Sequence, residues 1–314
     1  MVGQVIGHYL IDANIGEGRS AVVYKARDIR LNRTVAIKVL KDEHLQHSLA
    51  WGRLLREAQI ASALNHPNVC ALYDIGEEQD VHYVVLEFVE GKTLRATLEL
   101  GPLPTQIVFQ YGIQLAEAMA YTHGAGILHR DFKSSNIIVT RAGQIKVVDF
   151  GLATLMEEAA AKQNEDSHSS AQDIAWFVGT LPYMAPELLH GKAATIQSSV
   201  WSLGVILFEM LTGQLPFVGR TSFELGAEIM KGKIRPLPAD VPGGLRAIVQ
   251  RCLVRDVASR YYSAVEVVRY LQSEFVSFQV RCLLSRPDYL KRRALLQGQL
   301  KYALTVLSAI FHGN

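Results

Sequence analysis

Residues 129–136 bring an acid, a lysine and an amide close together along the chain. Asp131 is followed two residues later by Lys133 and five residues later by Asn136. An aspartate can accept the proton of an attacking hydroxyl, a lysine can steady the γ-phosphate of a nucleotide, and an amide oxygen can hold a metal ion. The segment therefore predicts a site for phosphoryl transfer within one tight loop.

A further acidic residue, Asp149, ends a short apolar stretch and is followed by Phe150 and Gly151. Magnesium is bound in proteins by few carboxylates together with phosphate oxygens. Alone, an Asp-Phe-Gly tripeptide indicates only a turn. Its position shortly after Asn136 favours a metal ligand that acts together with the loop at residues 129–136.

A glycine-containing loop near the start of the chain could approach an anion. Gly16 and Gly18 follow Ile15, and glycines at this spacing let backbone N–H groups come close to phosphate oxygens. Other phosphate-binding glycine loops open a helix, but this one runs into an apolar stretch typical of a strand. The pattern predicts a hairpin that covers phosphates, and a plain hairpin turn is the alternative.

Lys38 lies on the same face of a predicted strand as Ala36 and needs an anionic partner if that face is buried. On the helix expected at residues 48–64, Glu57 falls within the arc of apolar side chains. A Lys38–Glu57 ion pair would hold the ammonium where phosphate oxygens can reach it. The alternatives are a lysine in water on an edge strand and a glutamate in water at the border of the arc.

The elements that must position these residues change in kind along the chain. Short stretches rich in β-branched and aromatic residues predict strands at residues 22–24, 34–39 and 81–86. Apolar residues at helical spacing predict helices at residues 107–123, 200–212 and 245–253. A strand-rich front and a helical rear are typical of the α+β class.

The composition is that of an ordinary globular protein. The 314 residues are 49% hydrophobic and 20% charged, and 32 basic residues against 30 acidic ones give a net charge of +2. The high hydrophobic fraction excludes a disordered chain. The near balance of basic and acidic residues gives no support for a nucleic-acid partner. The three cysteines have no metal-ligand spacing and fit a reducing compartment. Without a recognisable secretory signal at the start, we expect a cytoplasmic location.

Taken in order, the motifs resemble those of the eukaryotic-like (Hanks-type) protein kinases, in the serine/threonine branch found in bacteria. The resemblance extends over residues 9–271 and includes residues 185–187, Ala-Pro-Glu. It implies a two-lobed α+β fold with a strand-rich small lobe at 1–88 and a helical large lobe at 89–275. ATP with a metal ion would lie in the cleft, and a helical tail at 276–314 would follow this kinase domain.

The resemblance also implies a role for each matching residue. Asp131 would be the catalytic base, Lys133 and Thr180 would support it, and Asn136 and Asp149 would bind Mg²⁺, which Mn²⁺ could replace. Val23, Ala36 and Ile138 would enclose the adenine, and Leu86 would occupy the gatekeeper position. The backbones of Glu87 and Val89 would contact the edge of the adenine. The residues implied to bind nucleotide are Ile15, Gly16, Gly18, Val23, Ala36, Lys38, Glu57, Leu86, Glu87, Val89 and Ile138.

Regulation is implied by the long polar loop before residue 180. Arg130 directly precedes Asp131, and a cation beside the base favours a phosphate group that neutralises it. The loop serines Ser167, Ser169 and Ser170 are therefore candidate phosphorylation sites, and ordinary solvated serines are the alternative. Glu187 would pair with Arg260 and tie the end of the loop to the helical lobe.

Two positions depart from the family pattern. Ala21 replaces the third glycine of the phosphate loop, which would cost about 1 kcal/mol if that position needs a positive φ. Ser199 stands where the family usually has an aspartate that accepts hydrogen bonds from the catalytic-loop backbone. A neutral hydroxyl is a weaker acceptor than a carboxylate, so we expect a slower or less rigid catalytic loop.

The C-terminal residues lie outside the resemblance. Apolar residues at spacings of three and four predict an amphipathic helix within residues 291–311. Docking on the helical lobe is one interpretation, and contact with a partner or a membrane surface is the other.

Together these features predict a serine/threonine protein kinase that transfers the γ-phosphate of ATP to protein substrates and phosphorylates itself within residues 152–180. A pseudokinase-like scaffold that binds nucleotide without useful catalysis is the alternative, motivated by Ala21 and Ser199. A small-molecule phosphotransferase of related fold is disfavoured, since residues 185–187 resemble a platform for protein substrates.

Overall fold

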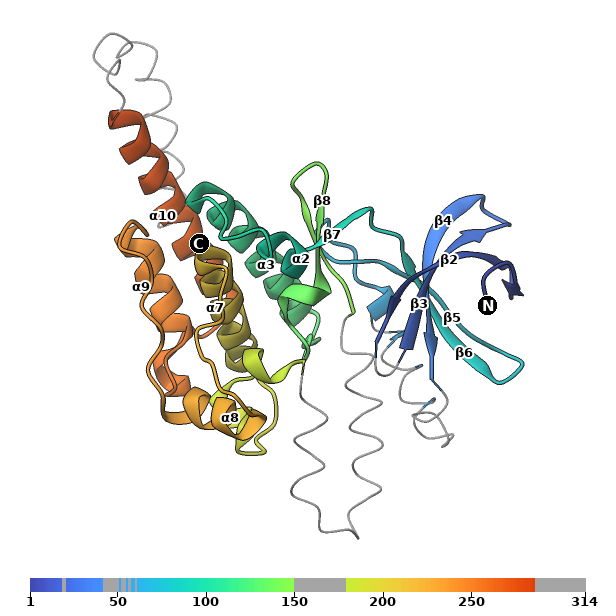
Figure 1. Ribbon diagram of the computed structural model, residues 1–314. Coiled ribbons are helices and arrows are strands. Elements are labelled where there is room, and N and C mark those ends of the chain that lie inside the picture. Colours follow the sequence, from blue (N-terminus) through green and yellow to red (C-terminus); the bar gives the residue numbers. More distant parts are fainter. Residues whose placement is uncertain are drawn as a thin grey trace. The chain divides into compact units, whose positions relative to one another are not determined.

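The chain folds into two compact units. Unit 1 consists of residues 1–97 and 121–180, and unit 2 of residues 98–120 and 181–314. The computed structural model describes residues 1–18, 21–41, 61–149 and 179–285, together with residues 51, 55, 58 and 59 (Figure 1). Glu57, Ser167, Ser169, Ser170 and the helix predicted within residues 291–311 lie outside the described residues, so these remain predictions.

Unit 1 contains a six-stranded antiparallel sheet with the strand order β1-β2-β3-β4-β6-β5. Its strands are β1 Val5–Ile6, β2 Tyr9–Glu17, β3 Ala21–Asp28, β4 Arg33–Leu40, β5 Leu72–Glu78 and β6 Val81–Glu87. The strand predictions at residues 22–24, 34–39 and 81–86 are confirmed. Because β4 lies between β3 and β6, Lys38 is on an interior strand and not on an edge.

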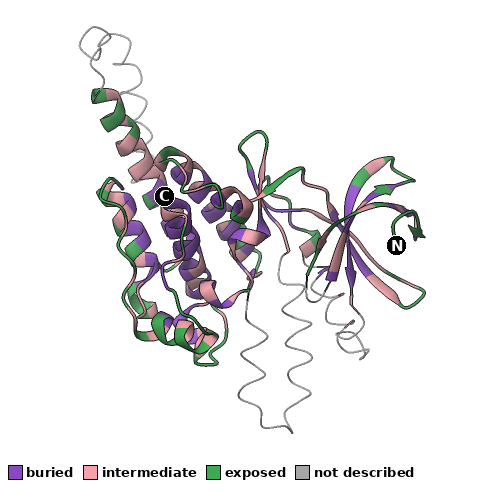
Figure 2. Ribbon diagram, in the orientation of Figure 1, coloured by how far each residue is buried: buried purple, intermediate pink, exposed green. Residues whose placement is uncertain are grey.

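Alternation along β4 separates two apolar clusters, one on each face of the sheet. Val35, Ile37 and Val39 belong to one cluster. Ala36 and Leu40 belong to the other, as expected where successive side chains point to opposite faces. Lys38 lies on the same face of β4 as Ala36 and is only 5% exposed. Figure 2 shows the buried residues running along these strands.

A second, three-stranded sheet of unit 1 carries the loop at residues 129–136. Its strands are β7 Gly91–Thr93, β8 Ile137–Thr140 and β9 Ile145–Val147. A single 3₁₀ turn, Ser134–Asn136, leads directly into β8. Ile137 pairs with Val147, and the Asn136 carbonyl accepts the Val148 N–H at 2.9 Å. The antiparallel register therefore places Asn136 opposite the residue that precedes Asp149.

Unit 2 is helical, as the resemblance implied. Its helices are residues 105–120 of α3 (Thr105–Gly124), α6 Pro186–Leu189, α7 Ile196–Thr212, α8 Ser222–Lys231, α9 Gly243–Cys252 and α10 Ala264–Leu284. The short helix α2 Leu94–Leu98 and the 3₁₀ turns Leu181–Tyr183 and Val257–Ser259 complete the described elements. The helix predictions at 107–123, 200–212 and 245–253 are confirmed. Within the described part of the chain, no helix is long and apolar enough to cross a membrane.

Helix α7 is the central element of unit 2. It begins with a capping box, in which the Thr195 side chain and Ser198 exchange hydrogen bonds, and it ends at Gly213 in the left-handed conformation. Its middle turns, including Trp201 and Phe208, are almost completely buried. Because the middle of α7 is buried on nearly all its sides, neighbouring helices must pack closely against it.

A glycine allows the contact between α7 and α9. A Cβ atom added to Gly204 would lie 2.5 Å from Cβ of Cys252, whereas one added to Gly226 of α8 would meet nothing within 4 Å. We expect Gly204→Ala to lower the free energy of unfolding by about 1–3 kcal/mol through overpacking. Gly226→Ala, the control, should raise it by about 0.5–1 kcal/mol through helix propensity. Urea denaturation measures both, and equal effects would contradict this interpretation of the α7–α9 contact.

Candidate active site

The loop at residues 129–136 gathers four of the predicted residues into one hydrogen-bonded group, the Asp131 cluster (Asp131, Lys133, Asn136 and Thr180). Oδ1 of Asp131 accepts the Thr180 hydroxyl at 2.7 Å. Oδ2 lies 2.7 Å from Nζ of Lys133 and accepts the Asn136 amide at 2.9 Å. Lys133 also donates to the Thr180 hydroxyl at 3.1 Å. Thr180 is far away in sequence, so the fold and not local spacing brings it to the acid.

The Asn136 amide group is oriented by its two hydrogen bonds. Its N–H₂ group donates to both the main-chain oxygen of Asp131, at 3.0 Å, and the Asp131 carboxylate. The side chain is 7% exposed, and its Oδ1 atom has no protein hydrogen bond within the described residues. An amide fixed through its nitrogen presents its oxygen outward as an acceptor or metal ligand. This orientation fits the metal-binding role implied for Asn136.

Asp149 follows β9 and forms an ion pair with Lys38. Nζ of Lys38 lies 2.7 Å from Oδ1 of Asp149, and the two side chains are 6% and 29% exposed. Burial would raise the pKa of the Asp149 carboxyl, but the Lys38 ammonium holds this pKa below its ordinary value. Asp149 is therefore charged at neutral pH, as a metal ligand requires. Whether Glu57 also contacts Lys38 stays a prediction.

Two residues of the site have a left-handed backbone. Arg130 has a φ of 60° and Asp149 a φ of 61°. For residues other than glycine this conformation costs about 1–2 kcal/mol. Such strain persists where the surrounding structure fixes it, and here it lies next to Asp131 and at Asp149 itself. The backbone therefore stores strain at Asp149 and at Arg130, the residue before Asp131.

His129, which sequence reasoning used only as part of a motif, connects the main chain of Asp131 with that of Val148, the residue before Asp149. Its Nε2 lies 2.9 Å from the Val148 carbonyl, and its Nδ1 accepts the Asp131 N–H at 3.3 Å. The ring is 3% exposed, and burial lowers its pKa, although Asp131 acts in the opposite direction. A neutral imidazole can donate from one nitrogen and accept at the other. Its place two residues before Asp131 was the sequence signal for this role.

Most of the apolar residues predicted to enclose the adenine lie together. Val23, Ala36, Leu86 and Val89 belong to one cluster on the Lys38 face of the sheet, and Ala36 pairs directly with Leu86. Ile138 is half-buried on β8 and is not among the members of that cluster. The structure thus assembles one apolar wall from β3, β4 and β6.

The polar edge of this wall is formed where β6 ends. The Glu87 N–H donates to the Ala71 carbonyl at 2.9 Å, and the Glu87 carboxylate accepts Nζ of Lys146 at 2.7 Å. The Val89 N–H makes no hydrogen bond within the described residues. Lys146 was not singled out in the sequence, and no local pattern pointed to its pairing with Glu87.

The glycine loop is the hairpin between β2 and β3, as predicted. The Gly18 N–H donates to the Ala21 carbonyl at 2.8 Å, and a Cβ atom on Gly16 would meet nothing within 4 Å. Ala21 is the first residue of β3, 3% exposed, and its φ is not positive. The cost considered for an alanine at this position therefore does not arise. Ile15, in the same hairpin, is 49% exposed.

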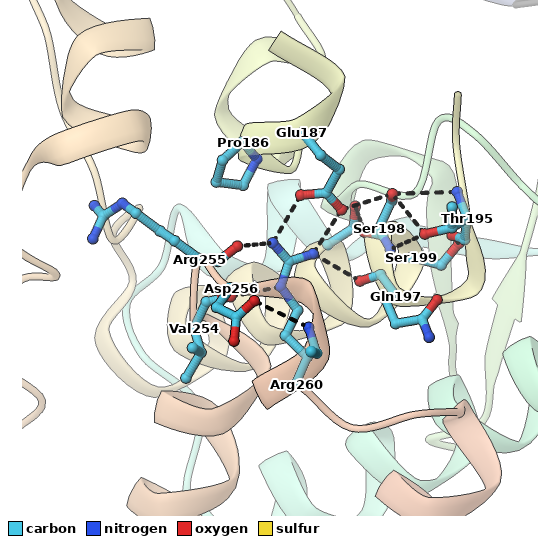
Figure 3. Close-up of polar contacts among 12 residues, drawn as sticks. Pro186, Glu187, Thr195, Gln197, Ser198, Ser199, Val254, Arg255, Asp256 and Arg260 are labelled. Carbon is cyan, nitrogen blue, oxygen red and sulfur yellow. Dashed lines mark hydrogen bonds and ion pairs between the residues drawn. The ribbon is translucent and has the colours of Figure 1, made fainter. Parts of the chain in front are cut away.

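In unit 2, the predicted pair of Glu187 with Arg260 is present and buried (Figure 3). The Arg260 guanidinium donates to both carboxylate oxygens of Glu187, at 2.7 and 2.8 Å. Its other N–H groups donate to the carbonyls of Val254, Gln197 and Arg255. All five donors of the guanidinium are thereby satisfied. Ser199, nearby on α7, is 8% exposed and donates to the Thr195 carbonyl at 3.5 Å.

The Glu187–Arg260 pair makes the stability of unit 2 depend on pH. Burial would raise the pKa of the Glu187 carboxyl, but hydrogen bonds from Arg260 bring it below its ordinary value of 4.5. A carboxyl whose pKa is lower in the folded than in the unfolded state adds to the free energy of unfolding at pH values above its unfolded pKa. This contribution is lost as the pH falls through the folded-state pKa. We expect the difference in unfolding free energy between wild type and Glu187→Gln to shrink below about pH 4.5. Urea titrations at several pH values test this, and a pH-independent difference would contradict it.

Comparison with known proteins agrees with this geometry. A protein kinase domain model matches residues 9–275, so the chain belongs to the protein kinase family. A probable serine/threonine-protein kinase of Clostridium perfringens, CPE1738, is 34% identical over 87% of this chain and 39% of its own length. Serine/threonine-protein kinase PrkC of Bacillus subtilis is 34% identical over 87% of this chain and 41% of its own. Serine/threonine-protein kinase PknB of Mycobacterium leprae is 34% identical over 81% of this chain and 40% of its own length. The chain thus spans about two fifths of the length of these relatives.

Proposed function

We propose that the chain transfers the γ-phosphoryl group of ATP to serine or threonine hydroxyls of proteins. The observation that carries this proposal is the Asp131 cluster, built in the same compact unit as the Lys38–Asp149 pair. The names of the relatives supply the serine/threonine class. We further propose that the catalytic domain covers residues 1–275, divided into lobes at residue 88, and that residues 276–314 form a tail.

Asp131 accepts the proton in the proposed reaction. The acceptor hydroxyl oxygen bonds to the γ-phosphorus, the bond from phosphorus to the oxygen bridging the β- and γ-phosphates breaks, and ADP leaves. The proton passes from the hydroxyl to the Asp131 carboxylate. A carboxylate offers roughly four lone-pair sites, and three groups occupy this one. A place for the acceptor hydroxyl remains, and Lys133 beside it can contact the transferred phosphoryl group.

A divalent cation fits the residues that face the phosphates. Asn136 offers Oδ1, and Asp149 offers the carboxylate oxygen that Lys38 does not engage. Oxygen ligands of this kind suit Mg²⁺, which also takes phosphate oxygens, and Mn²⁺ can replace it. When bound, the cation offsets the negative charge that develops on the phosphates. Lys38 lies next to this place and is available to the α- and β-phosphates.

Transfer of radiolabel from γ-labelled ATP to the chain and to a basic protein such as histone tests the proposal. We expect label on serine and threonine, and mass spectrometry should locate the sites of self-phosphorylation. Ser167, Ser169 and Ser170 are the candidates, and in the proposed regulation a phosphate on one of them neutralises Arg130. A chain that binds ATP but never transfers label would establish the pseudokinase alternative. No observation in the described residues favours that alternative.

The cellular setting belongs to the same proposal. The described cysteines are free, Cys70 and Cys252 being buried and Cys282 exposed, which fits a reducing, cytoplasmic compartment. The proposed partners are protein substrates and no nucleic acid, and a contact with a partner or a membrane surface is proposed through residues 291–311.

Ser199 allows a test of the expectation, taken from the family resemblance, that an aspartate at this position supports the catalytic loop. We expect Ser199→Asp to increase both turnover and thermal stability, because a carboxylate accepts backbone N–H bonds more strongly than a hydroxyl by about 1 kcal/mol or more. Steady-state kinetics and a thermal melt measure the two effects. Ser199→Ala serves as the control, and unchanged activity and stability in Ser199→Asp would show that this departure from the family pattern has no consequence.

A further inference from the structure

The hairpin between β2 and β3 has an acid between its two glycines. Glu17 is the last residue of β2 and is exposed. A hydrogen bond from Lys41 holds the pKa of the Glu17 carboxyl below its ordinary value, so this side chain is charged at neutral pH. A negative charge in a hairpin that covers phosphates repels them. This repulsion opposes nucleotide binding unless a cation offsets it.

Lys41 supplies the offsetting cation from the end of a neighbouring strand. Its Nζ atom lies 2.8 Å from Oε1 of Glu17. Two pairings in the sheet explain this contact. Ala21, the first residue of β3, pairs with Leu40 at the end of β4, and on the other side of β3 Glu17 pairs with Val22. Because Lys41 directly follows β4, its side chain reaches across the start of β3 to the acid.

The glycine N–H groups of this hairpin have partners within it. The Gly16 N–H donates to Oδ1 of Asn14 at 3.0 Å, and the Gly18 N–H donates to the Ala21 carbonyl at 2.8 Å. In this conformation, charge is the property through which the hairpin acts on a phosphate, since Coulomb interactions extend beyond hydrogen-bond distance. The net charge beside the glycines therefore affects how strongly the phosphates are held.

We propose that Lys41 is a positioning residue for nucleotide binding: it neutralises Glu17 and ties it to the end of β4, so that the hairpin covers the phosphates without repelling them. This inference rests on the nucleotide binding in the proposed function and extends it to a side chain outside the site described above. The two side chains are 35% and 62% exposed, and an exposed ion pair adds little to stability. The effect of the pair therefore belongs to phosphate binding and not to the free energy of unfolding.

Three ligands that differ in charge test this role. ATP, ADP and adenosine share the base and the ribose, but adenosine carries no phosphate. We expect Lys41→Met to weaken the binding of ATP about fivefold and that of ADP about twofold, because the uncompensated Glu17 repels the phosphates. Adenosine should bind as it does to wild type. Displacement of a fluorescent ATP analogue by each ligand, in a buffer with Mg²⁺, gives the three affinities without phosphoryl transfer.

A double variant shows whether Lys41 acts through Glu17. Both charges are absent in Glu17→Gln/Lys41→Met, and we expect its ATP affinity to lie within about twofold of wild type. Glu17→Gln alone should bind ATP at least as tightly as wild type. The loss in Lys41→Met should also shrink as the salt concentration rises from about 0.1 to about 1 M, since salt screens exposed charges. A double variant as weak as Lys41→Met would overturn the inference, because the lysine would then act without the acid.

Arg141→Met is the matched control. Arg141 forms another exposed ion pair of unit 1, with Glu90 at 3.1 Å, and this change removes one positive charge just as Lys41→Met does. We expect its affinities for all three ligands to equal those of wild type. Equal losses in the two variants, an unchanged ATP affinity in Lys41→Met, or an equal loss for ATP and adenosine would overturn the inference and leave the proposed function intact.

The wild-type chain separates the two proposals. If it binds ATP with the expected differences among the variants but never transfers label, the proposed function fails and the role of Lys41 stands. A wild-type chain that binds none of the three ligands would overturn both.

Discussion

Replacing Asp149 by asparagine is expected to reduce phosphoryl transfer at least about 1,000-fold, while the nucleotide still binds. The amide has nearly the same shape and keeps an oxygen for Nζ of Lys38, which lies 2.7 Å from Oδ1. It lacks the negative charge that a divalent cation needs. The loss should therefore fall on kcat and on metal affinity, and only weakly on the fold.

Radiolabel transfer from γ-labelled ATP measures the loss of phosphoryl transfer, and titration with a fluorescent ATP analogue measures whether the nucleotide still binds. Asp74→Asn is the control, because Asp74 also accepts a hydrogen bond in unit 1, from the Tyr9 hydroxyl at 2.9 Å. It should retain full activity. An Asp149→Asn variant with more than about one tenth of wild-type activity would contradict the role proposed for Asp149.

Replacing Arg260 by alanine is expected to lower the free energy of unfolding by about 3–5 kcal/mol, because removing one partner leaves a buried charge without compensation. Glu187 is 7% exposed and would lose both guanidinium bonds. The carbonyls of Val254, Gln197 and Arg255 would lose their donor as well. Arg260→Lys should recover only part of the loss, since an ammonium cannot satisfy the same planar set of acceptors.

Two further variants separate the pair from its surroundings. In the double variant Glu187→Leu/Arg260→Met, both charges are absent, so the loss should be smaller than in Arg260→Ala. Arg251→Ala breaks a more exposed pair of the same unit, with Glu266 at 3.1 Å, and should cost about 1 kcal/mol or less. Urea denaturation of all variants gives the comparison, and equal losses in Arg251→Ala and Arg260→Ala would refute it.

Local spacing predicted the contacts that are short in sequence, and a resemblance was needed for the longer ones. Asp131, Lys133 and Asn136 lie in one loop, so their side chains had to be near each other. Thr180 was assigned by resemblance alone, because nothing in its neighbourhood points to an acid so far away in sequence. For Lys38 the sequence suggested Glu57, whereas the described partner is Asp149, which lies 111 positions further along the chain and follows a strand of the other sheet.

The hydrogen bonds between α7 and residues 181–187 show a different limit. Polar residues at spacings of four and seven within an apolar helix, here Ser198, Ser202 and Glu209, could have been noticed as one face. Their partners could not, since Tyr183 and Glu187 belong to a 3₁₀ turn and a four-residue helix that are too short for a periodic pattern to appear. The Lys146–Glu87 pair was equally hidden, because each residue alone resembles an ordinary charged residue at the surface. Sequence patterns thus define elements and their faces, while contacts between irregular segments come from the fold.

The chain passes between the two compact units at three places, and the last of them is the peptide bond joining Thr180 to Leu181. Lys38, Asp131, Asn136 and Asp149 lie before this bond, and α7 lies after it together with residues 181–187, to which it is hydrogen-bonded. Substitutions on α7 therefore replace none of the four residues to which the proposed chemistry is assigned.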